Sequence, residues 1–442
     1  MIKDLTEGEP QSVLVQFTLP MFVSVVFQQM YNIADSAIAG KFAGEDALAA
    51  VGASYPITMI FMAIAVGSNV GCAVIISQLF GGRHYESMKT AISTTMISAF
   101  VLSIFLTIFG LAGNRVLMEM IHTPENIFAD GALYLKIYIG GFLFLFLYNV
   151  ATGIFTSLGD SKTPLYFLIG SSVGNIILDL IFVAVFHWGV AGVAWATFIA
   201  QGIACILALM TLKKRISRIK TENKPALFSK EMLGRISVVA IPSILQQSFV
   251  SVGNIFIQSL VNGFGSSVIA GYSAAIKLNT FAITSLSTLG NVVSSFTAQN
   301  IGAGKRERIG KGFIAGLKMG AVVVILFFTC YFFGNKAALG LFLSAKDSKA
   351  AMDTGIQFLT IVSPFYVVIA IKLIADGILR GASAMKAFMV STFADLLLRV
   401  ILAYAFVPHF GSKGIWMSWP VGWTVAMLLS VGLYVAIFKK QK

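Results

Sequence analysis

The two halves of the chain repeat one another, and both are strongly apolar. Residues 242–310 repeat the pattern of residues 20–89, with Pro20 lying 222 positions before Pro242. The register continues downstream to the C-terminal part of the chain. Such duplication in a polytopic membrane protein indicates transport, because alternating access is commonly a rocking of two repeats around a site between them.

The composition predicts an all-α polytopic membrane protein. Of the 442 residues, 57% are hydrophobic and 12% are charged, against roughly 25% charged in an ordinary soluble domain. A spanning helix needs about 20 apolar residues. We therefore expect twelve transmembrane helices, six per repeat, near residues 13–40, 48–80, 91–113, 133–158, 165–186, 190–212, 236–262, 268–299, 312–334, 354–380, 386–408 and 412–438. The expected organisation is an N-lobe at 1–212, a cytoplasmic basic linker at 213–235 and a C-lobe at 236–442.

The distribution of positive charge predicts the topology. The net charge is +13, and eight of the 32 Lys and Arg residues lie between Lys213 and Arg235. Basic residues concentrate in loops that are cytoplasmic when the N-terminus is inside, as the positive-inside rule requires. We expect a multi-pass protein of the cell (inner) membrane with both termini cytoplasmic. The basic run at 213–220 favours contact with anionic lipid headgroups, and no nucleic acid partner is expected.

The first predicted helix carries a polar face. Gln28, Asn32 and Asp35 follow the spacing i, i+4, i+7, and Tyr31 lies four residues before Asp35. These side chains therefore share one side of the helix. An ionisable residue inside a membrane span is costly and is a functional candidate for that reason.

A second acid is expected deep in the N-lobe. Asn175 and Asp179 lie one turn apart in one predicted helix, and Thr197 lies in the next. If Asp35 and Asp179 meet, both cannot ionise unless a proton or a cation lies between them. With Asn175 and Thr197 they would form an oxygen-rich cage suited to a small hard cation. The alternative is that the two acids are separate structural groups that never meet.

The C-lobe repeats the polar face without the acid. Gln247, Asn254 and Gln258 lie on the seventh predicted helix, where Ile257 occupies the repeat position of Asp35. We expect cation chemistry in the N-lobe and a cavity wall in the C-lobe. Hydrogen bonding between helices explains these polar side chains equally well.

The two acids inside the predicted spans of the C-lobe each have a basic neighbour on their own helix. Lys372 and Asp376 are one turn apart, as are Asp395 and Arg399. This i, i+4 spacing predicts two structural ion pairs.

Several classes of activity are excluded by what the sequence lacks. The four histidines do not cluster, so no metal is expected beyond Na⁺ at the coupling site. The Walker motif GxxxxGK[ST] does not occur, and no catalytic cluster is present. We expect neither an enzyme nor a cofactor, and no ATPase subunit is required.

The sequence strongly resembles the multidrug and toxic compound extrusion (MATE) family of secondary transporters. The matching strings are LPMFVSVVFQQMYNIADSAIAG, SLGDSKTP, GNIILDLIFV with GVAGVAWAT, ILRGAS and LLLRVILAY. The resemblance implies two pseudo-symmetric six-helix lobes around a V-shaped central cleft. It also implies export of organic compounds, driven by inward Na⁺ or H⁺.

One branch of that family has an N-lobe cation site, which matches Asp35, Asn175, Asp179 and Thr197 here. Another branch places essential acids in the C-lobe, including a glutamate on the seventh helix. This sequence has no acid in that helix, and Asp376 alone is left as a remnant.

The predicted function is cation-coupled antiport that exports drugs or organic, often cationic, compounds by alternating access. The partners are small organic molecules and membrane lipids. Candidate substrate contacts are Gln28, Tyr31, Asn32, Gln247, Asn254, Gln258 and Asp376. One alternative is a lipid-linked sugar flippase of related two-lobe architecture, which should line its cleft with several Arg or Lys. A channel or an intramembrane enzyme is the third alternative.

Overall fold

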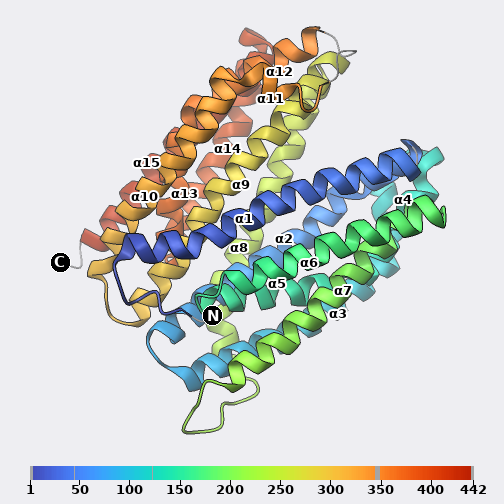
Figure 1. Cartoon of the computed structure of the whole chain (residues 1–442). Helices are drawn as coiled ribbons and strands as arrows, with labels where there is room; N and C mark the ends of the chain where they lie inside the picture. Colours follow the sequence, from blue (N-terminus) through green and yellow to red (C-terminus); the bar gives the residue numbers. More distant parts are fainter. Residues whose placement is uncertain (1–2, 44, 122, 344–348, 440–442) are drawn as a thin grey trace. The chain divides into compact units, whose positions relative to one another are not determined.

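The computed structural model describes residues 3–43, 45–121, 123–343 and 349–439, and the regular structure of this part is helical (Figure 1). The helices of the first half are α1 (Pro10–Ile38), α2 (Glu45–Gly81), α3 (Tyr85–Met120), α4 (Glu125–Gly140), α5 (Phe142–Ser157), α6 (Lys162–Asp179) and α7 (Gly189–Ser217). Those of the second half are α8 (Lys230–Asn262), α9 (Ser266–Gly302), α10 (Glu307–Phe328), α11 (Asn335–Leu339), α12 (Lys349–Val362), α13 (Tyr366–Gly381), α14 (Met385–Phe410) and α15 (Ser412–Lys439).

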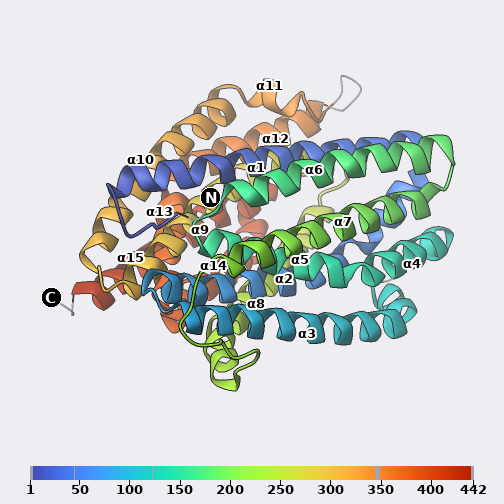
Figure 2. The same cartoon turned by 60° about the horizontal axis from the view of Figure 1, so that its bottom comes forward.

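The chain forms two compact units. The first contains residues 3–4 and Leu19–Ser248, and the second contains Leu5–Thr18 and Phe249–Lys442 up to the last described residue. Within the first unit α2 packs against α3, α4 and α5, and α6 packs against α7. Within the second unit α9 packs against α10, α12 and α13, and α14 packs against α15, as Figure 2 shows from a second direction.

All twelve expected segments are helical, which confirms the predicted fold class. Ten helices of the described chain are long and apolar enough to cross a membrane, and the bent pair α4 and α5 makes an eleventh. The twelfth expected span, α9, is not among these apolar helices. Its buried residues include the polar side chains of Asn279, Gln299 and Asn300. A helix enclosed by neighbouring helices can carry such polar side chains because they find partners inside the protein.

The structure changes several of the expected boundaries. The segment predicted at 133–158 is bent by 48° between α4 and α5. Helix α3 is longer at both ends than the predicted 91–113. Helix α7 continues to Ser217, and α8 begins at Lys230, so the non-helical part of the linker is 218–229. Basic side chains can prolong a helix beyond the membrane because water solvates them there.

The linker packs back onto the first unit. The Ser93 hydroxyl donates to the carbonyl of Ala226 at 3.2 Å, and the backbone N–H of Ser229 donates to Thr94 at 3.0 Å. Asn223 donates to Glu86 at 3.3 Å. These contacts fix the connection between the two repeats against α3.

Small residues allow close helix crossings in both units. An added Cβ at Gly71 of α2 would lie 2.4 Å from the Cα atom of Ala240 on α8. An added Cβ at Gly377 of α13 would lie 2.2 Å from the carbonyl oxygen of Gly290 on α9. Such backbone contact is how membrane helices associate, because lipid tails offer no hydrophobic drive between them.

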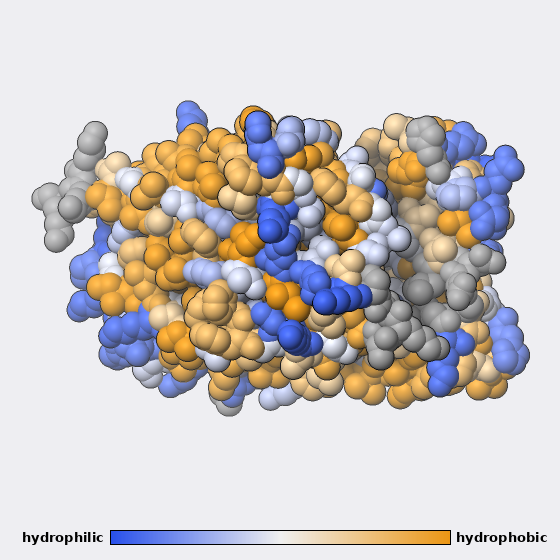
Figure 3. Space-filling view, turned by 90° about the horizontal axis from the view of Figure 1, so that it is seen from above, coloured by the Kyte–Doolittle hydropathy of each residue, from blue (hydrophilic) through white to orange (hydrophobic). Residues whose placement is uncertain are grey.

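Large apolar side chains are exposed on the outer faces of the helices. Phe105, Ile108 and Phe109 of α3 are each 64% exposed, as is Ile325 of α10. Figure 3 shows that apolar residues cover much of the face drawn there. The pattern is that of a protein whose solvent is the hydrocarbon of a bilayer.

Candidate cation site

Two carboxylates meet inside the first unit, where their helices change geometry. Asp35 lies near the end of α1, which continues as a π-helical segment η1 (Ala39–Ala43), and Asp179 ends α6, which continues as the π-helical segment η2 (Leu180–Val185). The segments η1 and η2 contact each other, and the two carboxyl groups are close enough to share a proton. Local π-helix inside an α-helix is frequent at functional sites.

These carboxylates are short of hydrogen-bond donors. Asp179 is 1% exposed, and neither of its oxygens has a hydrogen-bond partner among the described residues. The same holds for Oδ1 of Asp35, Oδ1 of Asn175 and Oε1 of Gln201. Buried polar atoms normally have partners. Four of these five acceptor oxygens belong to Asp35, Asn175 and Asp179, where a shared proton or a small hard cation could supply the missing partner.

Hydrogen bonds fix the amide of Asn175 on α6 and the hydroxyl of Thr197 on α7. The Asn175 amide donates to Thr197 Oγ1 at 3.5 Å, and the Thr197 hydroxyl donates to the carbonyl of Val193 at 3.1 Å. Donation through Nδ2 leaves Oδ1 of Asn175 as a buried acceptor without a partner among the described residues. Tyr31 lies near Thr197 and near both acids. The residues predicted for the site are thus brought together.

A mostly apolar pocket lies beside this site, between α4, α5 and α7. Tyr134, Tyr138 and Phe198 line it, together with Thr197 and Gln201. Thr197 therefore borders both the pocket and the acids. Neither Tyr134 nor Gln201 was among the predicted site residues. The i, i+4 spacing of Thr197 and Gln201 is a sequence signal for Gln201, whereas Tyr134 has no such signal.

The polar residues predicted on α1 and α8 are half-buried or exposed. Gln28 donates to Asn32 at 3.2 Å within the first unit, and Gln258 donates to Asn262 at 2.8 Å within the second. Asn254 is exposed. Gln247 belongs to the first unit, although it was predicted as part of the C-lobe wall. Ile257, the repeat counterpart of Asp35, is fully buried.

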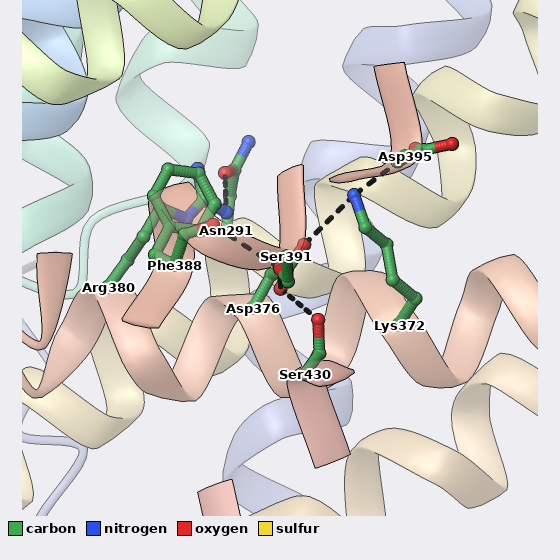
Figure 4. A network of polar contacts seen from close by, with 8 residues as sticks. All are labelled: Asn291, Lys372, Asp376, Arg380, Phe388, Ser391, Asp395 and Ser430. Atoms are coloured by element: carbon green, nitrogen blue, oxygen red, sulfur yellow. Dashed lines mark hydrogen bonds and ion pairs between the residues drawn. The ribbon is translucent and has the colours of Figure 1, made fainter. Parts of the chain in front are cut away.

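The second unit holds its acids in a closed network of charges (Figure 4). Lys372 Nζ lies 3.1 Å from Asp376 Oδ2 and 3.6 Å from Asp395 Oδ2. The hydroxyls of Ser391 and Ser430 donate to Asp376 Oδ1 at 2.9 and 2.6 Å. Asp376 therefore has no free oxygen for a substrate, which argues against its role as a substrate contact.

One predicted ion pair is wrong. Asp395 pairs with Lys372 of α13, whereas the Arg399 guanidinium lies 4.5 Å from the ring centroid of Trp419 on α15. The i, i+4 spacing places Asp395 and Arg399 on one face of α14. In the structure, however, Asp395 contacts Lys372 of α13 and Arg399 contacts Trp419 of α15. The serines that bind Asp376 were also missed. The sequence contained a signal for Ser391, because it lies four residues before Asp395. It contained no such signal for Ser430.

Comparison with known proteins places the chain in a family. The MatE family model matches residues 20–181 and again residues 242–405. The two matches coincide with the internal repeat found in the sequence.

Curated relatives and solved structures agree with this match. The chain is 31% identical to "Probable multidrug resistance protein YpnP" of Bacillus subtilis over 93% of this chain and 92% of the relative. It is 28% identical to "Probable multidrug resistance protein YoeA" of the same organism over 96% and 94%. Its fold matches that of a MOP superfamily transporter from Pyrococcus furiosus with a TM-score of 0.92 at 22% identity, over 99% of this chain and 97% of that one. The chain belongs to the MATE family and is therefore a multi-pass membrane transporter, not an enzyme.

Proposed function

We propose that this transporter exports organic compounds in exchange for inward Na⁺ or H⁺, and that Asp35, Asn175, Asp179 and Thr197 hold the coupling cation. The relatives named for multidrug resistance support export of small organic molecules. No cofactor is required for such exchange, because the ion gradient supplies the free energy.

One observation carries the cation site. Oδ1 of Asp35, Oδ1 of Asn175 and both carboxylate oxygens of Asp179 come from two helices, are buried, and have no donor among the described residues. Two adjacent carboxylates in a low dielectric need a positive charge between them. Carboxylate, amide and hydroxyl oxygens are the ligands that hard cations prefer.

The location of the acids suggests how binding is linked to conformational change. Asp179 lies at the junction between α6 and the π-helical segment η2, and Asp35 lies four residues before the π-helical segment η1. A ligand shifts a conformational equilibrium only through its different affinities for the two states. Carboxylates that meet in one state and separate in the other would give the cation such a difference. Cation entry would then favour the state that releases substrate outward.

The polar face of α1 lies next to this cage and is proposed to contact the substrate. Gln28, Tyr31 and Asn32 share a helix with Asp35, and Tyr31 lies close to both acids. We propose Gln247, Asn254 and Gln258 of α8 for the same role. A substrate held at the polar face of α1 would sense whether the acids of the first unit are neutralised.

Transport in proteoliposomes tests the proposed function. Vesicles are loaded with ethidium, and an inward gradient of Na⁺ or of H⁺ is imposed one at a time while the membrane potential is clamped. One of the two gradients should accelerate ethidium efflux relative to protein-free vesicles. Efflux that responds to neither gradient would contradict cation coupling.

The proposed topology has both termini and the linker in the cytoplasm. In a Cys330→Ser background, which removes the exposed native thiol, Ser217→Cys should resist impermeant thiol reagents added to intact cells. Lys336→Cys should react, because this residue is exposed and the three helices α8, α9 and α10 separate it from position 217 along the chain. Reaction at position 217 with protection at position 336 would reverse the orientation.

A flippase for lipid-linked sugars is less compatible with the described interior. It must bind anionic phosphate, which favours Arg and Lys side chains. The first unit instead presents two buried carboxylates at its site, and Lys372 of the second unit is already engaged by two acids.

A further inference from the structure

The two units resolve the same electrostatic conflict in different ways. In the first unit, Asp35 and Asp179 meet without any described basic side chain between them. In the second unit, the Lys372 ammonium lies against both Asp376 and Asp395. Each arrangement places two acids together in a membrane-spanning bundle, where uncompensated charge is costly.

The site in the second unit resembles a cation site: Asp376 and Asp395 supply the carboxylates, and the Lys372 ammonium occupies the position of the cation. Lys372, Asp376 and Asp395 are 4%, 2% and 6% exposed. The ammonium contacts one oxygen of each carboxylate, and these oxygens come from α13 and α14. Figure 4 shows the lysine side chain reaching between them.

The other oxygens of the two acids reinforce this geometry. Ser391 of α14 and Ser430 of α15 donate to Asp376 Oδ1, which orients Oδ2 of this acid toward Lys372. Asp395 Oδ1 has no hydrogen-bond partner among the described residues. Asp376 is therefore held from α14 and α15 independently of Lys372, whereas Lys372 is the ion-pair partner of Asp395 among the described residues.

The nearby arginines do not replace the lysine. Arg380 donates to Asn291 at 2.9 Å and lies over Phe388, and Arg399 lies over Trp419. Neither forms an ion pair with Asp376 or Asp395 among the described residues. Removal of the Lys372 ammonium would leave two carboxylate oxygens facing an emptied space the size of a lysine side chain.

We propose that Lys372 is a tethered cation that fills a monovalent-cation site formed by Asp376 and Asp395, and that truncating it opens this site to Na⁺. A tethered charge cannot leave during transport, so the charge of this site stays constant through the cycle. This inference is independent of the proposed function, because it concerns the second unit alone.

The test uses the full-length protein with the first-unit acids removed. In an Asp35→Asn/Asp179→Asn background, Lys372→Ala is compared with its parent in NaCl and in choline chloride at equal ionic strength. The melting temperature of Lys372→Ala should rise with the logarithm of the Na⁺ concentration, as for any ligand that binds only the folded state. Bound ²²Na⁺ should increase by about one ion per chain over the parent, as expected for one added site.

Three control variants define the result. Lys277→Ala removes an exposed lysine that lies over Phe342 in the same unit, and should gain no Na⁺ response. Lys372→Arg keeps the charge and should also gain none. Adding Asp376→Asn and Asp395→Asn to Lys372→Ala should abolish the response.

Two results would overturn the inference. One is that the Lys372→Ala protein binds no more Na⁺ than its parent. The other is that the melting temperature of Lys372→Ala depends on pH but not on Na⁺, which would mean that Asp376 and Asp395 share a proton. If Lys372→Ala does not accumulate in choline chloride, it is purified in NaCl. Recovery of folded protein in NaCl alone supports the site, and equal loss in both salts contradicts it.

Discussion

Asp179→Asn should abolish gradient-driven transport while the protein stays folded. The amide has the shape of the carboxylate but lacks its charge, so the pair with Asp35 no longer requires a cation. We expect the driven rate of ethidium efflux to fall about 100-fold or more, which corresponds to roughly 2.7 kcal/mol. Asp35→Asn should have the same effect, because either acid alone leaves the cage one charge short.

Stability measurements separate this loss from misfolding. Removing one of two adjacent buried carboxylates relieves repulsion, so the melting temperature in Na⁺-free buffer should not fall. If Na⁺ is the coupling ion, the rise in melting temperature that it produces should disappear in both variants. The matched control is Asp130→Asn on α4, an exposed acid of the same unit, which should leave transport and stability unchanged. If Asp35→Asn and Asp179→Asn both kept gradient-driven transport, residues outside this site would have to couple the cation to the substrate.

Gly377→Ala should strongly destabilise the second unit. The added Cβ would lie 2.2 Å from the carbonyl oxygen of Gly290 and 3.2 Å from its Cα atom, and backbone cannot turn aside as a side chain can. Alanine favours a helix over glycine by roughly 1 kcal/mol, but separating α9 from α13 costs packing along the whole crossing. We expect a net loss of about 3 kcal/mol, at the upper end for overpacked cores.

The control for this substitution is Gly310→Ala on α10. Nothing lies within 4 Å of an added Cβ at that position, so the helix preference of alanine acts alone. Melting temperature and the yield of folded protein measure both variants. Equal stability of Gly377→Ala and Gly310→Ala would show that α9 and α13 are not held at backbone contact.

The fold class could be predicted from the sequence because a bilayer admits few kinds of spanning structure. Apolar runs of spanning length and the internal repeat predicted every helix that crosses the membrane. The bend between α4 and α5 was missed, since Gly140 and Gly141 in an apolar run do not by themselves specify an angle. The lengths of α3 and α7 beyond the membrane were missed for a related reason: hydropathy marks the bilayer, not the end of the helix.

The candidate site was predictable where one helix face determined it. Asp35 and Asp179 stood out as acids without a basic neighbour, Asn175 followed from its spacing to Asp179, and Thr197 followed from the family resemblance. The pairing of Asp395 with Lys372 was not predictable in this way, because Arg399 satisfied the same i, i+4 rule. Which partner lies nearer depends on how α13 and α14 pack, and a single sequence does not state that packing. The hydrogen bond from Ser430 of α15 to Asp376 of α13 likewise depends on how these two helices pack.

Running the exchange backward tests coupling at Asp35 and Asp179 most directly. Proteoliposomes start with equal Na⁺ and equal pH on both sides, and an ethidium gradient is the only driving force. The wild type should move ²²Na⁺, or protons reported by a pH-sensitive dye, against the developing gradient and opposite to ethidium. Asp179→Asn should move neither. Cation movement of equal size in wild type and Asp179→Asn, or ethidium flux in the wild type with no accompanying cation, would contradict the account.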